Sequence, residues 1–323
     1  MLQPLDSEKA KKEKEESHED DALRRKRRAD EFRRTFSVWK FVDPKQPWIL
    51  VENGSFLGFF DWLPEHFRIG PWSISALALL FTIAYLILLA GVYFTTPHSQ
   101  PWFPNSDIYH GSVVDMYPDA WSAPWYYHSF GLLWMIFIIY VIYTGPTGPR
   151  AWCTYTVQSW TLLTFRHGLC VLAPWSSTAA SVAEWTRFPA ACSATVTFFV
   201  WNFAVFPSVY LFFLKDPEHK RNFFKFCTSF RMLNIHFANI VLAAINCGPW
   251  ASPRRRLVWM DLYVSMVSIL IYMGLYLLIF DRLGIHMYPL FSPRTSMVLP
   301  AWTSLLGVYL LTFYAWRWIV DIV

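Results

Sequence analysis

The sequence predicts an all-α fold, a polytopic transmembrane helical bundle with about seven spans. Apolar residues make up 54% of the chain, and 18 of its 323 residues are Trp. These apolar residues come in long runs, and a hydrocarbon core of roughly 30 Å needs about 20 apolar residues per helical span. A transmembrane β-barrel would instead show alternating segments of about ten residues, and no such pattern is visible in the sequence.

Seven apolar runs in the sequence are long enough to cross a membrane. Their centres are rich in Leu, Ile, Phe and Val, while Trp and Tyr collect at their ends, as in the aromatic belts of membrane proteins. Pro207 and Pro300 predict kinks in two of the spans. The predicted spans are residues 72–95, 124–144, 152–173, 188–214, 223–247, 257–280 and 297–320.

Charge divides the chain into three regions. Residues 1–70 form a charged extension that contains 14 Lys and Arg against 14 Asp and Glu, so the net charge of +5 arises elsewhere and a nucleic-acid partner is not expected. Its basic block, Arg24–Arg28, suits either a solvated helix or a surface helix on anionic lipid. Residues 71–122 hold the first predicted span and an aromatic-rich outer loop, and residues 123–323 hold the other six predicted spans.

Basic residues in the short loops predict the orientation. The loop Thr96–Ser122 contains Asp but no Lys or Arg, which places it outside and the N-terminus on the cytoplasmic or matrix side. This orientation leaves the glycosylation sequon Asn53-Gly54-Ser55 unmodified. The basic run Arg254–Arg256 falls on the outer side and disagrees with the rule.

Several kinds of chemistry are not indicated. The five cysteines are odd in number and show no C-x-x-C spacing, so neither disulfides nor a zinc site is predicted. The chain also has no P-loop, dinucleotide turn, H-E-x-x-H helix or G-x-S-x-G elbow. The spacing of its histidines does not require haem, although it leaves haem open. We therefore expect no metal and no cofactor.

A polar string in the third predicted span is the best candidate for a functional site, because polar side chains in hydrocarbon are costly. At 100° per residue one broad face of this span carries Thr156, Ser159 or Trp160, Thr164 and His167. The fifth span carries a second stripe, and the two stripes are expected to face each other or a shared cavity. A single Thr in such a helix usually bonds to its own i−4 carbonyl. The second stripe is Met232, His236, Asn239, Ala243 and Asn246.

Three short motifs resemble the rolling stone and androgen-induced-gene families of multi-pass membrane proteins. The first joins Ser159-Trp160 to Leu163-Thr164-Phe165. The second is the H-x-x-N of His236 and Asn239, and the third is the Tyr288-Pro289 corner before the last span. The resemblance covers residues 123–323 and rests on the order and spacing of these motifs. It implies a six-helix membrane core in these residues, to which the N-terminal extension and the first span are an addition.

The resemblance implies a threonine hydrolase, since the androgen-induced members hydrolyse fatty acid esters of hydroxy fatty acids with an intramembrane Thr and a His. Thr164 matches the nucleophile. Asn239 occupies the position of the expected base, and Asn cannot act as a general base. His236 matches a neighbouring His and is the remaining candidate. The H-x-x-N form is that of rolling stone, for which the family offers no established reaction.

Two functions follow as alternatives. The first is an accessory or structural subunit of a membrane assembly, with membrane lipids and other subunits as partners, the latter on residues 1–70. The second is an intramembrane hydrolase of lipid esters; a transporter has the least support. In either case a lipid carboxylate or phosphate could be held by charge-assisted hydrogen bonds. The candidate lipid-binding residues are Ser159, Trp160, Arg166, His167, His286 and Tyr288.

Overall fold

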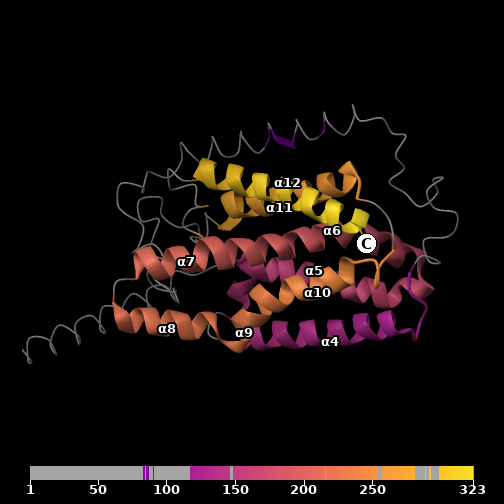
Figure 1. Ribbon diagram of the computed structural model, residues 1–323, viewed down its shortest axis with the longest axis horizontal. Coiled ribbons are helices and arrows are strands. Elements are labelled where there is room, and N and C mark those ends of the chain that lie inside the picture. The colour runs from indigo at the N-terminus through magenta and orange to yellow at the C-terminus, as the bar shows by residue number, and fades with distance from the viewer. Residues whose placement is uncertain are drawn as a thin grey trace, which may run out of the picture. The chain divides into compact units, whose positions relative to one another are not determined.

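The computed structural model describes five continuous stretches of the chain and six further residues (Figure 1). The stretches are residues 117–145, 148–214, 216–253, 257–280 and 298–322, and the single residues are Ile83, Tyr85, Leu86, Ala90, Tyr288 and Phe291. All regular structure in these ranges is helical, which confirms the predicted all-α class. Helices carry the labels of Figure 1.

The chain forms two compact units. The larger contains residues 77–275 and 299–323, and therefore every helix from α4 to α11 and nearly all of α12. The smaller contains residues 1–76 and 276–298; its described part is a π-helical turn, η8 (Tyr276–Phe280), together with Tyr288, Phe291 and Val298.

The helices of the larger unit begin at residues that cap their free N–H groups. Ser122, Thr154 and Ser176 accept hydrogen bonds from the N–H groups two or three residues into α4, α5 and α6. Asp216 does the same for α8, which has Pro217 in its first turn. These helices are α4 (Ala123–Tyr143), α5 (Tyr155–Leu172), α6 (Ser177–Phe199) and α8 (Pro217–Cys227).

Two helical rods that lie within the larger unit contain π-helical turns. The first continues from α6 through η5 (Val200–Val205), α7 (Phe206–Ser208) and η6 (Val209–Phe213). The second consists of α9 (Phe230–Leu233), η7 (Asn234–Ala238) and α10 (Asn239–Cys247). Such turns are rare and frequently lie at functional sites.

Both prolines singled out in the sequence lie within helical rods, and the kinks expected at them stay predictions. Pro207 lies between the π-helical turns η5 and η6, in a rod that continues past it. Pro300 lies in the first turn of α12 (Val298–Ile322), where a proline removes no helical hydrogen bond and needs no kink. Pro189, which was not singled out in the sequence, is buried inside α6.

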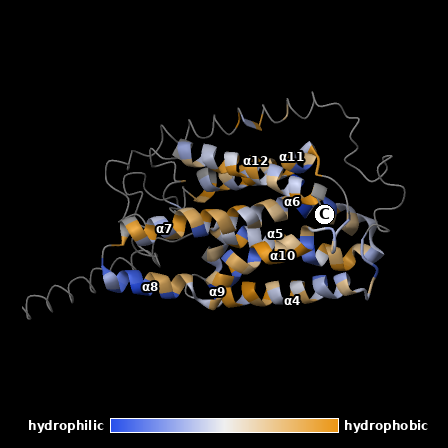
Figure 2. Cartoon of the chain, viewed as in Figure 1, coloured by the Kyte–Doolittle hydropathy of each residue, from blue (hydrophilic) through white to orange (hydrophobic). Residues whose placement is uncertain are grey.

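Helices α4, α5, α6 and α10 run alongside one another, and α6 also contacts α11 (Trp259–Leu275) (Figure 1). The last helix, α12, packs on α6 through a Phe188–Phe313 ring contact and a hydrogen bond from Trp316 Nε1 to Thr195 Oγ1 at 2.9 Å. Hydrophilic residues gather on α8, whereas α4 and α9 are largely hydrophobic (Figure 2).

Three helices of the described chain are long and apolar enough to cross a membrane, which marks the protein as a membrane protein. They are Ala123–Tyr143, Ser177–Leu211 and Phe230–Cys247; the apolar helix α11 is shorter. The count of seven spans stays a prediction. The first predicted span lies almost wholly outside the described residues, as do the N-terminal extension and Arg254–Arg256.

Candidate functional site

The predicted polar face of the third span is buried. Thr156, Ser159, Trp160, Thr164 and His167 of α5 are all 8% exposed or less. Phe165 on the same helix is 53% exposed, so the helix has a buried and an open side. The buried face that the 100° spacing per residue predicts for this helix is therefore confirmed.

The second stripe is buried too, and it lies against the first. Its members Met232, His236, Asn239, Ala243 and Asn246 are at most 9% exposed. Side-chain contacts join Thr156 to His236, Ser159 to Asn239 and Arg166 to Asn246, each pair separated by 80 positions. Because the residue number rises along both helices from pair to pair, α5 and the α9–α10 rod run in the same direction. We call these three pairs the polar ladder.

The first pair of the ladder orients a histidine against a hydroxyl. His236 Nδ1 donates to the Met232 carbonyl at 3.1 Å, since a carbonyl can only accept. Nε2 is then the acceptor nitrogen, and it lies 3.4 Å from Thr156 Oγ1. The ring of Trp201, from the π-helical turn η5, stacks on His236 with centroids 4.1 Å apart and an interplanar angle of 18°.

Thr164 is placed differently from the predicted site. Its hydroxyl donates to the carbonyl of Trp160, one turn back in its own helix, at 2.7 Å. No hydrogen bond among the described residues joins Thr164 to His236, which pairs with Thr156 instead. Thr156 and Thr164 are about 12 Å apart along the helix at 1.5 Å per residue, which explains why His236 cannot serve both.

The second pair is a weak contact between uncharged groups. Asn239 Nδ2 donates to Ser159 Oγ at 3.4 Å, and Asn239 Oδ1 is buried without a partner in the described part of the chain. Trp160, the neighbour of Ser159, is fully buried and donates from Nε1 to the Met135 carbonyl of α4 at 3.1 Å. Trp160 therefore ties α5 to α4 rather than lining an open site.

The third pair contains a fully buried arginine. Arg166 Nη1 donates to Asn246 Oδ1, to the Asn246 carbonyl at 3.2 Å and to Cys170 Sγ at 3.1 Å. Nη2 donates to Ser252 Oγ at 2.8 Å. This arginine caps the C-terminal end of α10, where carbonyl groups lack helical partners and favour a cation.

A second buried arginine, Arg187, was missed in the sequence because the fourth span was predicted to start at residue 188. Arg187 is 1% exposed and donates from Nε to the Cys247 carbonyl at 2.9 Å and from Nη1 to the Pro253 carbonyl at 2.6 Å. It also pairs with Glu184 at 3.3 Å, one turn earlier on α6. That i, i+3 spacing of opposite charges was the signal that could have identified it.

His167 packs against α4 among aromatic rings. Its ring centroid lies 5.4 Å from those of Tyr127 and His128, and neither of its nitrogens has a hydrogen-bond partner within the described ranges. His128 links the same region to the arginines, because its Nε2 donates to the Ala251 carbonyl at 2.8 Å and its Nδ1 accepts from Asn246 Nδ2 at 3.4 Å.

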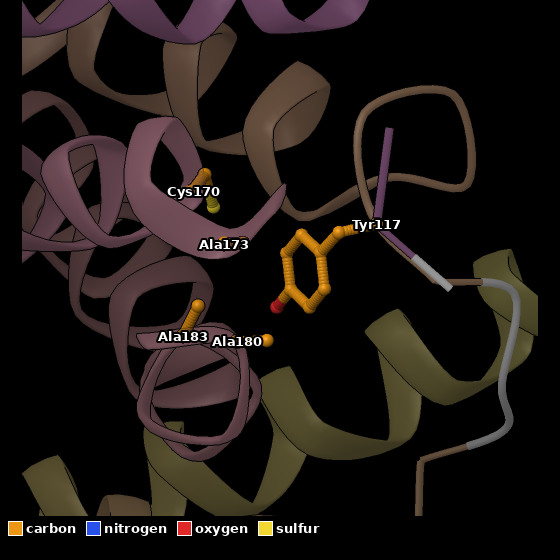
Figure 3. Close-up of a cluster of buried hydrophobic side chains, with 5 residues drawn as sticks. All are labelled: Tyr117, Cys170, Ala173, Ala180 and Ala183. Carbon is orange, nitrogen blue, oxygen red and sulfur yellow. The ribbon is translucent and has the colours of Figure 1, made fainter. Parts of the chain in front are cut away.

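Tyr117, just before α4, inserts its ring between the end of α5 and the start of α6 (Figure 3). Its hydroxyl donates to Glu184 Oε2 at 3.2 Å. Burial raises the pKa of Tyr117 well above its ordinary value, and the negative charge of Glu184 raises it further. Small side chains make room for the ring: Cys170, Ala173, Ala180 and Ala183.

The remaining predicted residues lie elsewhere. Tyr288 belongs to the smaller unit, where its N–H donates to the Tyr276 hydroxyl at 3.1 Å and its carbonyl accepts from that hydroxyl at 2.9 Å. His286 lies outside the described residues. Within the described ranges no group of three or more His, Cys, Asp or Glu is arranged to hold a metal ion.

Comparisons of the chain with protein-family models, with curated proteins and with solved structures find no match.

Proposed function

We propose that this chain is an accessory or structural subunit of a membrane assembly, with lipid bound to its helical core. The observation that carries the proposal is how the polar ladder uses its side chains. The Thr164 hydroxyl donates to its own helix, while Ser159 with Asn239 and Arg166 with Asn246 form hydrogen bonds between α5 and α10. Such bonds fix the position of one helix against another.

The surroundings of the ladder support the same role. Large apolar side chains of α4 point away from the larger unit, with Phe130 at 68% and Tyr140 at 65% exposure. A face of this kind suits lipid tails or an apolar helix of another subunit. The charged residues 1–70 offer a polar segment for contacts outside the membrane. The resemblance to rolling stone agrees with a core that has no established reaction.

Assembly can be tested by native mass spectrometry of the full chain extracted in a mild detergent. We expect species well above the chain mass of 37.9 kDa, and a shift toward that mass when residues 1–70 are deleted. A matched control replaces Arg24–Arg28 by Lys, which keeps the charge and should keep the assembly. Detection of the full chain only at the mass of a single protomer would contradict the subunit proposal.

A second candidate function, hydrolysis of a lipid ester, is favoured by one observation. Thr156, His236 and the Met232 carbonyl have the order of a nucleophile, a base and a group that orients the base. In such a reaction His236 Nε2 would take the hydroxyl proton while Thr156 Oγ1 attacks the ester carbonyl. The ester C–O bond would then break, and the alcohol would leave with the proton from His236. Water, deprotonated by the same nitrogen, would hydrolyse the acyl-threonine to the acid and restore the hydroxyl. The 3.4 Å separation is long for this proton transfer, and it would have to shorten when substrate binds.

Labelling with a fluorophosphonate probe separates the two candidates. The subunit proposal expects no labelling of the wild type. Labelling that Thr156→Ala and His236→Ala both abolish, and that Thr164→Ala leaves intact, would establish the hydrolase at Thr156. Labelling that depends on Thr164 would instead restore the pair expected from the sequence. Thr161→Ala is the matched control, since Thr161 donates to its own helix at Val157.

A further inference from the structure

The two buried arginines lie next to each other. Arg166 donates to the carbonyl of Asn246 and to the hydroxyl of Ser252. Arg187 donates to the carbonyls of Cys247 and Pro253, the residues that directly follow those two. Cα atoms of successive residues are about 3.8 Å apart. Both guanidinium groups therefore bridge the same two places, the end of α10 and the turn after it, and must be neighbours.

Their positive charge is only partly balanced. Glu184 lies 3.3 Å from Arg187, whereas Arg166 has no carboxylate partner among the described residues. The C-terminal end of α10 supplies about half a negative charge through its free carbonyls. Among the described residues, two guanidinium groups face one carboxylate and this partial charge, which leaves about half a positive charge in a buried site. Buried charges are costly unless they are paired.

Each arginine also has one donor nitrogen that makes no hydrogen bond to the described residues. Arg166 Nε and Arg187 Nη2 are buried N–H groups with no hydrogen-bond partner in the described part of the chain. Buried polar groups are almost always partnered by protein, water or ligand. Guanidinium donors match the paired oxygens of a phosphate or carboxylate better than those of any other side chain.

We propose that Arg166 and Arg187 form a binding site for one oxyanion, a phosphate or carboxylate group, at the end of the bundle where α5 and α10 finish. The anion accepts from Arg166 Nε and Arg187 Nη2, and its negative charge offsets the remaining positive charge of the pair. The site is near the helix ends, because Arg166 lies about 9 Å from the last residue of α5 along the helix axis. Glu184, 15% exposed at its side chain, marks the side on which the pair approaches solvent.

This inference specifies the chemistry of the lipid contact in the proposed function and needs no other subunit. It is tested on the purified full chain in nanodiscs by thermal unfolding, with two probes. One arm compares phosphatidylcholine discs with discs of phosphatidylcholine and phosphatidylglycerol. The other adds inorganic phosphate to phosphatidylcholine discs against sodium chloride of equal ionic strength. We expect Tm to rise by about 3 °C or more in at least one arm.

The two arms identify the source of the anion. A rise with phosphatidylglycerol alone assigns the site to a lipid headgroup, and a rise with inorganic phosphate assigns it to a free anion. Arg166→Lys and Arg187→Lys keep the charge but remove the guanidinium donors, so each should lose at least half of the rise. Arg221→Lys, at an exposed position on α8, should keep all of it.

Two results would overturn the proposal. The first is a wild-type Tm that neither probe raises, which needs no variant to fold. The second is a rise that persists in full in both lysine variants, because the anion would then bind elsewhere, for example at Arg24–Arg28. Failure of the assembly test described above would leave both readouts unchanged, so the two proposals fail independently.

Discussion

Gly131 on α4 allows the His167 ring to lie against the α4 backbone. A Cβ atom at this position would be 2.5 Å from His167 Cε1 and 2.7 Å from Nδ1. Because His167 is fully buried, its ring has little room to move away. We expect Gly131→Ala to lower the free energy of unfolding by about 1–3 kcal/mol, measured by tryptophan fluorescence during denaturation in detergent micelles.

Gly168 is the matched control on the facing helix. A Cβ atom there would meet Leu132 Cδ1 at 3.7 Å and Cδ2 at 4.0 Å, which are ordinary van der Waals distances. Gly168→Ala should therefore leave stability unchanged or raise it slightly, since alanine favours helix over glycine. An equal loss in both variants would show that the α4–α5 contact does not depend on Gly131.

Tyr117 is expected to make stability depend on pH in the alkaline range. Its raised pKa means that the folded chain keeps the hydroxyl proton at pH values where the unfolded chain, with a pKa near 10, has lost it. Its contribution is thus present below about pH 10 and is lost as pH rises above it. Tyr117→Phe should cost about 1 kcal/mol at pH 7 by removing the bond to Glu184.

The measurement is Tm between pH 7 and pH 11. The wild type should lose stability above pH 10 more steeply than Tyr117→Phe, because only the wild type has this proton to lose. Tyr126→Phe, at a side chain that is 55% exposed, should follow the wild-type curve. Parallel curves for wild type and Tyr117→Phe would refute this role for the tyrosine.

Periodicity predicts which residues of a helix are buried but not which atoms pair. Thr156 and Thr164 both lie on the buried face of α5, and either could have met His236. The choice depends on the axial shift between α5 and α10, which is set by residues 173–233 and their packing, and no local pattern encodes it. The bond from Thr164 to its own helix is the outcome expected for a lone threonine.

At the level of elements, the three pairs of the polar ladder should differ in strength. Ser159 and Asn239 are uncharged and 3.4 Å apart, so their coupling in a double-mutant cycle should be about 0.6 kcal/mol. Arg166 is charged and contacts Asn246 at both its side chain and its carbonyl. The coupling between Arg166→Met and Asn246→Ala should be about 1.5–3 kcal/mol.

Unfolding free energies of the single and double variants in bicelles measure both couplings. Ser159→Ala with Asn239→Ala is the matched cycle on the same two helices. Equal coupling free energies would mean that the charge of Arg166 adds nothing to its interaction with Asn246. The polar ladder would then stabilise the helix pair through packing alone.

Helix boundaries were predicted well where apolar runs end at capping residues, and poorly where charges lie inside a helix. The first span of the core, predicted at residues 124–144, is α4 (Ala123–Tyr143). By contrast α6 begins at Ser177, well before residue 188, because Glu184 and Arg187 lower the hydropathy although they neutralise each other. The predicted span at residues 223–247 merged two helices that separate at Thr228 and Ser229.

At the scale of the whole molecule, composition was enough to predict an all-α membrane protein, since burying so many apolar residues in helices requires a lipid phase. The rare π-helical turns could not be predicted, because no local sequence pattern marks them. Trp201 of η5 and His236 of η7 stack on each other although they are 35 positions apart in the sequence. Orientation follows a weaker rule, as the disagreement at Arg254–Arg256 illustrates.

The orientation gives the final prediction. With the N-terminus inside and the loop Thr96–Ser122 outside, the sequon at Asn53 should carry no glycan when the chain is expressed in cells that glycosylate Asn. Asp107→Thr completes a new sequon at Asn105 in that loop, and this variant should gain one glycan. Digestion with an endoglycosidase, followed by gel electrophoresis, detects the change in mass. Asp107→Asn, which removes the same charge without making a sequon at Asn105, is the control. A glycan on Asn53 of the unmodified chain would invert the orientation and place the arginine site on the cytoplasmic or matrix side.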